Sequence, residues 1–153
     1  MNCFVRRASF ALIALLLVGC GDGGDGAGPV EGPVVSYTLT LSVSGDALIG
    51  ALQLEIEHLG NSGGFIGRGD QVDCQPLVQA LVAGNFAGEG LVRIGMISLQ
   101  GIPSPTALLQ CGFRTREEIV PGSFLVEVSD ASDINSQPLD PYPEVFVSQV
   151  TIR

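Results

Sequence analysis

Few side chains in this sequence could act in catalysis. The 153 residues include one histidine, His58, and no Gly-x-Ser-x-Gly motif, which would hold a nucleophilic serine on a sharp turn. His58 follows an alternating apolar stretch, a position typical of a packing residue rather than of a general base. Two carboxylate pairs, Glu55/Glu57 and Glu117/Glu118, lie where water is expected to surround them. The sequence therefore predicts a protein that is not an enzyme.

A second group of polar side chains lies near the C-terminus, in a segment rich in proline. Four carboxylates occur there: Asp130, Asp133, Asp140 and Glu144. Calcium takes about six to eight oxygen ligands, but the spacing departs from the EF-hand pattern because Ile134 replaces an expected ligand. The segment predicts either a weak Ca²⁺ site or a solvated acidic loop, and no other cofactor is expected. Tyr142, between two prolines, is a candidate residue for contact with a partner.

The cysteines carry the most specific signal. One of the four, Cys20, ends the stretch Leu17-Val18-Gly19-Cys20. This stretch completes an uncharged run, Ala8–Gly19, that follows Arg6 and Arg7, which is the layout of a secretory signal. As a helix the run would span about 18 Å, too short for roughly 30 Å of bilayer hydrocarbon. The stretch resembles the lipobox of bacterial lipoproteins, in which the cysteine receives lipid.

The lipobox resemblance implies where the mature protein begins and what holds it in place. Residues 1–19 would be removed as a signal peptide, and Cys20 would carry a diacylglyceryl group and, in many such proteins, an acyl chain such as palmitate on its amine. Two or more chains anchor a protein stably. Gly21 rather than aspartate follows Cys20, which favours the outer membrane of the cell envelope. The alternative is an ordinary secretory signal with a chance cysteine.

Removal of Cys3 and acylation of Cys20 would leave two cysteines, Cys74 and Cys111. Disulfides persist in the oxidising compartments outside the cytoplasm, so we expect these two to pair. On the chain-entropy model such a bridge stabilises the fold by roughly 3.8 kcal/mol. Two buried free thiols are the alternative.

The chain after Cys20 is strongly acidic. It contains all 16 acidic residues, five arginines and no lysine, for a formal charge of −11. Nucleic-acid binding requires a basic patch, and adsorption to anionic lipid favours Lys and Arg, so the composition argues against both partners. The lipid anchor, rather than charge, would therefore hold the protein to its membrane, and the acidity favours solubility.

The elements that must position these residues follow the cysteine. On the lipobox resemblance, residues 20–33 would be the lipidated cysteine and a glycine-rich linker, too poor in apolar residues to fold. We expect residues 34–153 to form one domain. Tyr37–Val43 and Leu52–Glu57 alternate apolar and polar residues, which predicts half-buried strands. Leu91–Leu99 is apolar on both faces, which predicts a central strand covered on both sides.

The remaining segments complete an all-β domain. Leu108–Arg114 alternates so that Cys111 points inward, whereas Leu59–Asp70 and Asp130–Glu144 are predicted loops. Pro76–Ala83 fits a two-turn helix and a short strand equally well. The expected fold is an antiparallel β-sandwich of about seven to nine strands with at most one short helix.

Two stretches also resemble a known family. Gly50–Glu57 is similar to the early strand of cohesin domains and of related carbohydrate-binding modules, and the segments around Leu91–Ile94 and Leu108–Phe113 are similar to their paired central strands. The resemblance spans residues 36–152. It implies a jelly-roll-type sandwich that binds a partner on a sheet face or at its loop rim.

Together these features predict a lipid-anchored, non-catalytic binding or adaptor module of the cell envelope. A protein is the first expected partner and a polysaccharide the second, because the chain has no Trp and 2 Tyr to stack on sugars. The alternative is a structural envelope lipoprotein without a dedicated ligand. Exposed apolar residues gathered on one sheet would favour binding, whereas a uniformly polar surface would favour the structural role.

Overall fold

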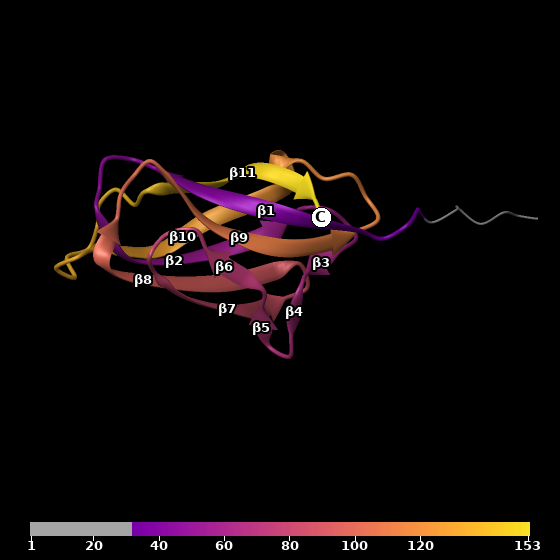
Figure 1. Cartoon of the computed structure of the whole chain (residues 1–153), viewed down its shortest axis with the longest axis horizontal. Helices are drawn as coiled ribbons and strands as arrows, with labels where there is room; N and C mark the ends of the chain where they lie inside the picture. The colour runs from indigo at the N-terminus through magenta and orange to yellow at the C-terminus, as the bar shows by residue number, and fades with distance from the viewer. Residues whose placement is uncertain (1–31) are drawn as a thin grey trace, which may run out of the picture. The chain divides into compact units, whose positions relative to one another are not determined.

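The computed structural model describes residues 32–153. The predictions for the signal peptide at 1–19, for Cys20 and for most of the linker lie outside these residues. Within them, strands form two antiparallel sheets that pack face to face, with β11, β1 and β9 above β8 and β7 in Figure 1. The predicted antiparallel β-sandwich is therefore confirmed. The described residues contain no helix that is long and apolar enough to span a membrane.

Residues 32–153 form eleven strands, which make up the two sheets, and one 3₁₀ turn. In chain order they are β1 (Val35–Ser44), β2 (Ile49–His58), β3 (Gly64–Phe65), β4 (Gly67–Arg68), β5 (Gln71–Val72), β6 (Cys74–Pro76), β7 (Leu81–Gly88), β8 (Leu91–Ile102), β9 (Thr106–Thr115), η1 (Pro121–Ser123), β10 (Phe124–Asp133) and β11 (Glu144–Ile152). Sheet A has the order β11-β1-β9-β3, with β6 also paired to β9, and sheet B has the order β10-β2-β8-β7-β5-β4.

The core lies between the two sheets and is built by period-two alternation. On β1 the side chains of Tyr37, Leu39, Leu41 and Val43 are buried, as the alternation predicts. On β2 the buried residues are Leu52, Leu54 and Ile56, while Gln53 and Glu57 face water. Each such buried aliphatic side chain stabilises the fold by about 1.5–3 kcal/mol relative to an exposed one.

The prediction that Leu91–Leu99 is covered on both sides is wrong. In β8, Val92, Ile94 and Met96 face the core, but Ile97 is 57% and Leu99 is 95% exposed. The second apolar face of the segment therefore lies on the outer surface of sheet B, where no further layer of the described residues covers Ile97 or Leu99.

The ambiguous segment Pro76–Ala83 contains no helix. Pro76 ends β6, and Leu81 begins β7 because Leu81 and Ala83 pair with β8. The predicted loop Leu59–Asp70 includes β3 and β4, so it is more ordered than expected. These short strands raise the total above the predicted range, although only seven of the 11 have eight or more residues.

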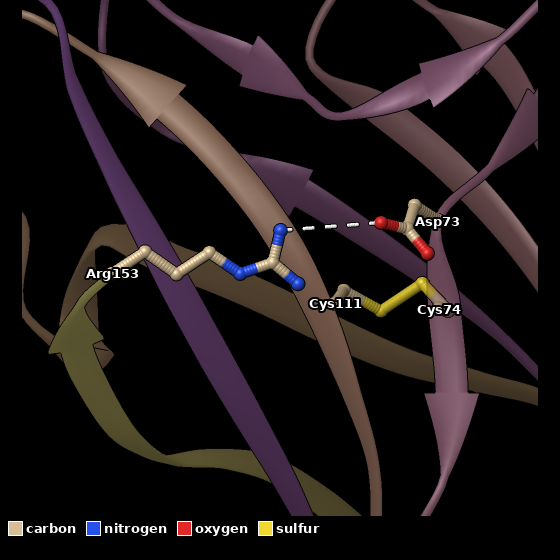
Figure 2. The surroundings of a disulfide bond; sticks show 4 residues. All are labelled: Asp73, Cys74, Cys111 and Arg153. Carbon is tan, nitrogen blue, oxygen red and sulfur yellow. Dashed lines mark ion pairs between the residues drawn. A yellow bond between two sulfur atoms is a disulfide. The ribbon is translucent and has the colours of Figure 1, made fainter.

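The predicted disulfide is present. Cys74 of β6 and Cys111 of β9 are register partners, and their sulfurs are bonded across a sequence separation of 37 residues. Figure 2 shows Arg153 reaching toward Asp73 beside this bond, with a guanidinium nitrogen 3.9 Å from the carboxylate. The Arg153 backbone N–H also donates to the Ser36 carbonyl, over 2.9 Å. The disulfide links β6 to β9, and the contacts of Arg153 hold the C-terminal residue against β1 and the segment before β6.

Candidate binding face

The outer face of sheet B is built from three rows of side chains, because residues paired in register point the same way. The first row is Ala51, Ile97 and Leu81, the second is Gln53, Gly95 and Ala83, and the third is Glu55, Arg93 and Asn85. Each row crosses β2, β8 and β7 in that order.

The second row has small residues at two of its three positions, Gly95 and Ala83, so the face is hollowed along this row. Gly95 has no side chain, and a Cβ built there would meet no other atom within 4 Å. Two adjoining hollows of about 260 Å³ and about 460 Å³ both contact Gln53, Ala83 and Gly95. We call this depression the Gly95 trench, and the first and third rows form its two walls.

One wall of the trench is apolar and faces water. Leu81 is 78% exposed, and its pairing partner Ile97 is followed on the same face by Leu99. A third hollow, of about 410 Å³, lies among these three side chains. We call Leu81, Ile97 and Leu99 the apolar corner. Contiguous exposed apolar side chains of this kind are typical of interaction surfaces.

The other wall pairs one carboxylate with one guanidinium, and further carboxylates flank it on β2 and β10. The Arg93 Nε donates to Glu55 Oε1, over 2.6 Å. Glu127 of β10 lies opposite Glu55 in the β10–β2 register, and Asp130 contacts the trench beside Gln53. Glu57 lies two residues along β2 on the same face. We call Glu55, Glu57, Glu127 and Asp130 the acidic side.

The outer face of sheet A differs from that of sheet B. Its hydroxyl and amide groups bond to one another: Ser42 Oγ lies 2.7 Å from Ser148 Oγ, and Gln110 Nε2 donates to Thr40 Oγ1 over 3.2 Å. Ser148 Oγ also donates to the Thr40 carbonyl, over 3.2 Å. These polar groups satisfy one another, and Phe146, which pairs with Ser42 and is 41% exposed, adds a partly exposed ring to this face.

The structure does not gather the four predicted calcium ligands. Asp133 Oδ1 accepts the backbone N–H groups of Gln137, over 2.9 Å, and Asn135, over 2.8 Å, and these bonds lower the pKa of Asp133, the Gln137 bond most. Glu144 accepts the Ser44 hydroxyl over 3.4 Å, and Asp140 lies exposed in the loop.

In residues 32–153 no group of three or more His, Cys, Asp or Glu side chains could hold a metal ion, and the calcium site stays a prediction. Tyr142 is 47% exposed in the loop that precedes β11. It therefore remains accessible to a partner, although it lies on a different element from the trench.

His58 packs within a cluster of aromatic rings. It is 8% exposed, with its ring centroid 4.7 Å from that of Phe113 and 5.2 Å from that of Phe124. Burial lowers the pKa of His58 below its usual value, and the charge of Glu117 partly opposes this shift. Such surroundings favour the neutral imidazole and agree with the packing role expected from the sequence.

Sequence reasoning missed the trench and the apolar corner, although one signal was present. Arg93, Gly95, Ile97 and Leu99 share a strand face by period-two alternation, and a charged residue on that face indicates contact with water. Comparison of the chain with family models, with curated proteins and with solved structures finds no match. A functional assignment therefore depends on the surface itself.

Proposed function

We propose that this protein is a lipid-anchored, non-catalytic binding module of the bacterial cell envelope that holds a protein partner on the outer face of sheet B. The observation that carries the proposal is the apolar corner beside the Gly95 trench. Burying one aliphatic side chain contributes about 1.5–3 kcal/mol, so three of them at the centre of an interface would supply a substantial driving force.

The proposed lipid anchor rests on the lipobox resemblance at Cys20. The proposed location in the outer membrane rests on Gly21, which follows Cys20 where an aspartate would favour the inner membrane. The acidic chain has no lysine, which favours a covalent lipid over electrostatic adsorption as the means of attachment. A tethered module of the cohesin-like type would present its sheet faces and loops to neighbours in the envelope.

A protein partner is favoured over a polysaccharide by the kind of side chains around the trench. Sugars stack on aromatic rings, whereas the residues around the trench and the apolar corner are aliphatic, small, amide or charged. The structural alternative, a lipoprotein without a dedicated ligand, is disfavoured because a solvated apolar corner has a cost and no benefit unless it is covered.

Site-specific photo-crosslinking in the native envelope tests the binding function. A photoreactive amino acid at Ile97 should give discrete adducts, whereas the same group at Gln149, exposed on the outer face of sheet A, should not. Labelling with fatty acid should mark the wild-type chain and not Cys20→Ser. Equal crosslinking at both positions, or none at either, would favour the structural role.

A further inference from the structure

The Gly95 trench has two chemically different sides. The apolar corner lies on β7 and β8, whereas the acidic side lies on β2 and β10. A partner that covers the trench must therefore offer aliphatic side chains at one end and a complement to carboxylates at the other.

The acidic side has more negative charge than the sheet neutralises. Arg93 already bonds Glu55, and Glu127 lies directly opposite Glu55, where like charges destabilise a strand pair. Within the described part of the chain, Glu127 and Asp130 have no ion-pair partner. A cation supplied by the partner would relieve this repulsion and would gain strength as water is excluded.

Two other occupants fit this charge distribution poorly. A second copy of the chain would bring another acidic side, whose Arg93 is already paired with Glu55, and residues 32–153 contain thirteen acidic residues against five arginines. An anionic membrane surface would be repelled in the same way. The surface thus complements a positively charged polypeptide.

Resting on the proposed function, we propose that the Gly95 trench binds a cationic, aliphatic segment of a partner protein. The aliphatic side chains cover Leu81, Ile97 and Leu99, one of them entering the space above Gly95. The Lys or Arg side chains of the segment lie over Glu127 and Asp130.

Three labelled peptides test this proposal on the lipidated full chain in phosphatidylcholine vesicles, with protein-free vesicles as the blank. One peptide combines leucine and lysine, the second replaces each lysine by glutamate, and the third replaces each leucine by serine. The Leu/Lys peptide should bind at least about tenfold more tightly than either of the others, and added salt should weaken it.

Two variants locate the peptide on the protein. Gly95→Leu fills the trench and should weaken Leu/Lys binding about tenfold, whereas Gly122→Leu, a matched control on the exposed turn η1, should not. Glu127→Lys with Asp130→Lys should weaken binding similarly. The same charge change at two exposed acids, Asp46→Lys with Asp140→Lys, should have a much smaller effect.

The outcomes separate this proposal from the broader function. If the peptide with glutamate in place of lysine binds, and Gly95→Leu weakens that binding, the cationic partner is overturned but the face remains a binding surface. Failure of the Leu/Lys peptide to bind, or binding unaffected by Gly95→Leu, would overturn the trench as its site, whatever the crosslinking at Ile97 shows. Self-association that Gly95→Leu abolishes would instead identify a second copy as the occupant.

Discussion

Arg93 and Glu55 form an ion pair of 2.6 Å on the outer face of sheet B, with side chains 67% and 31% exposed. Their strands are register neighbours, so the pair bridges β8 and β2 at the wall of the Gly95 trench. Exposed pairs contribute only about 0.2–1 kcal/mol because water and salt screen them. The pair therefore has more effect on the charge of the trench than on the stability of the fold.

Replacing Arg93 by alanine tests whether the ion pair affects the charge of the trench more than the stability of the fold. Arg93→Ala should lower the free energy of unfolding by at most about 1 kcal/mol, because the pair is solvated. It should also strengthen binding of the Leu/Lys peptide, since Glu55 then becomes available to a partner cation. Urea unfolding and peptide titration measure the two effects, and Glu55→Ala, made alone and in the Arg93→Ala background, completes the double-mutant cycle that isolates the coupling. Weaker peptide binding would contradict the predicted charge balance.

The disulfide should make a larger contribution to stability. Removing it with Cys74→Ser and Cys111→Ser should lower the free energy of unfolding by about 3–4 kcal/mol, because the loop it closes spans 37 residues. Denaturation with and without a reductant measures the same quantity in the wild-type chain. The double variant serves as the control, since reductant should leave its midpoint unchanged. A loss below about 1 kcal/mol would mean that packing around β6 already restricts the segment.

How far the sequence predicts this fold depends on whether the relevant contacts are local. The alternation of Leu52, Leu54 and Ile56 is a local pattern, and it identifies the strand and its buried face correctly. The cysteine pair follows from elimination once Cys20 is read as a lipid site. Pro76–Ala83 stays ambiguous because its conformation is decided by pairing with β8, a distant segment that local pattern does not show.

The trench could not be predicted for the same reason. It exists because Ala83 and Gly95 become neighbours in the β7–β8 register, and because Leu81 lies beside Ile97. In a single sequence, an exposed apolar residue such as Leu99 looks identical to a buried one. Only the position of Arg93 on the same strand face indicates that this face meets water.

His58 should make stability depend on pH in a narrow window. Its folded-state pKa is lowered, chiefly by burial, so the native protein binds the proton less readily than the unfolded chain does. Stability is therefore complete above about pH 6.5 and falls as pH drops below that value, because the unfolded state then takes up the proton. Urea unfolding at pH values from about 7 to about 5 measures the slope.

The control for this slope is His58→Gln, since His58 is the one histidine of the chain. The variant should lose stability overall, because the ring packs on Phe113 and Phe124, but its stability should vary less across the same window. An unchanged slope in the variant would assign the effect to carboxylates instead.

Truncation of Leu39 should lower the free energy of unfolding far more than truncation of Leu99, because Leu39 is fully buried and Leu99 is 95% exposed. Leu39→Ala removes core contacts and should cost about 2–5 kcal/mol of unfolding free energy. Leu99→Ser should change that quantity by less than about 0.5 kcal/mol, yet it should weaken binding of the Leu/Lys peptide, because the apolar corner loses its most exposed member. Thermal unfolding and peptide titration of both variants provide the comparison. A large loss of stability in Leu99→Ser would show that this side chain supports the fold and would remove the main reason for assigning it to binding.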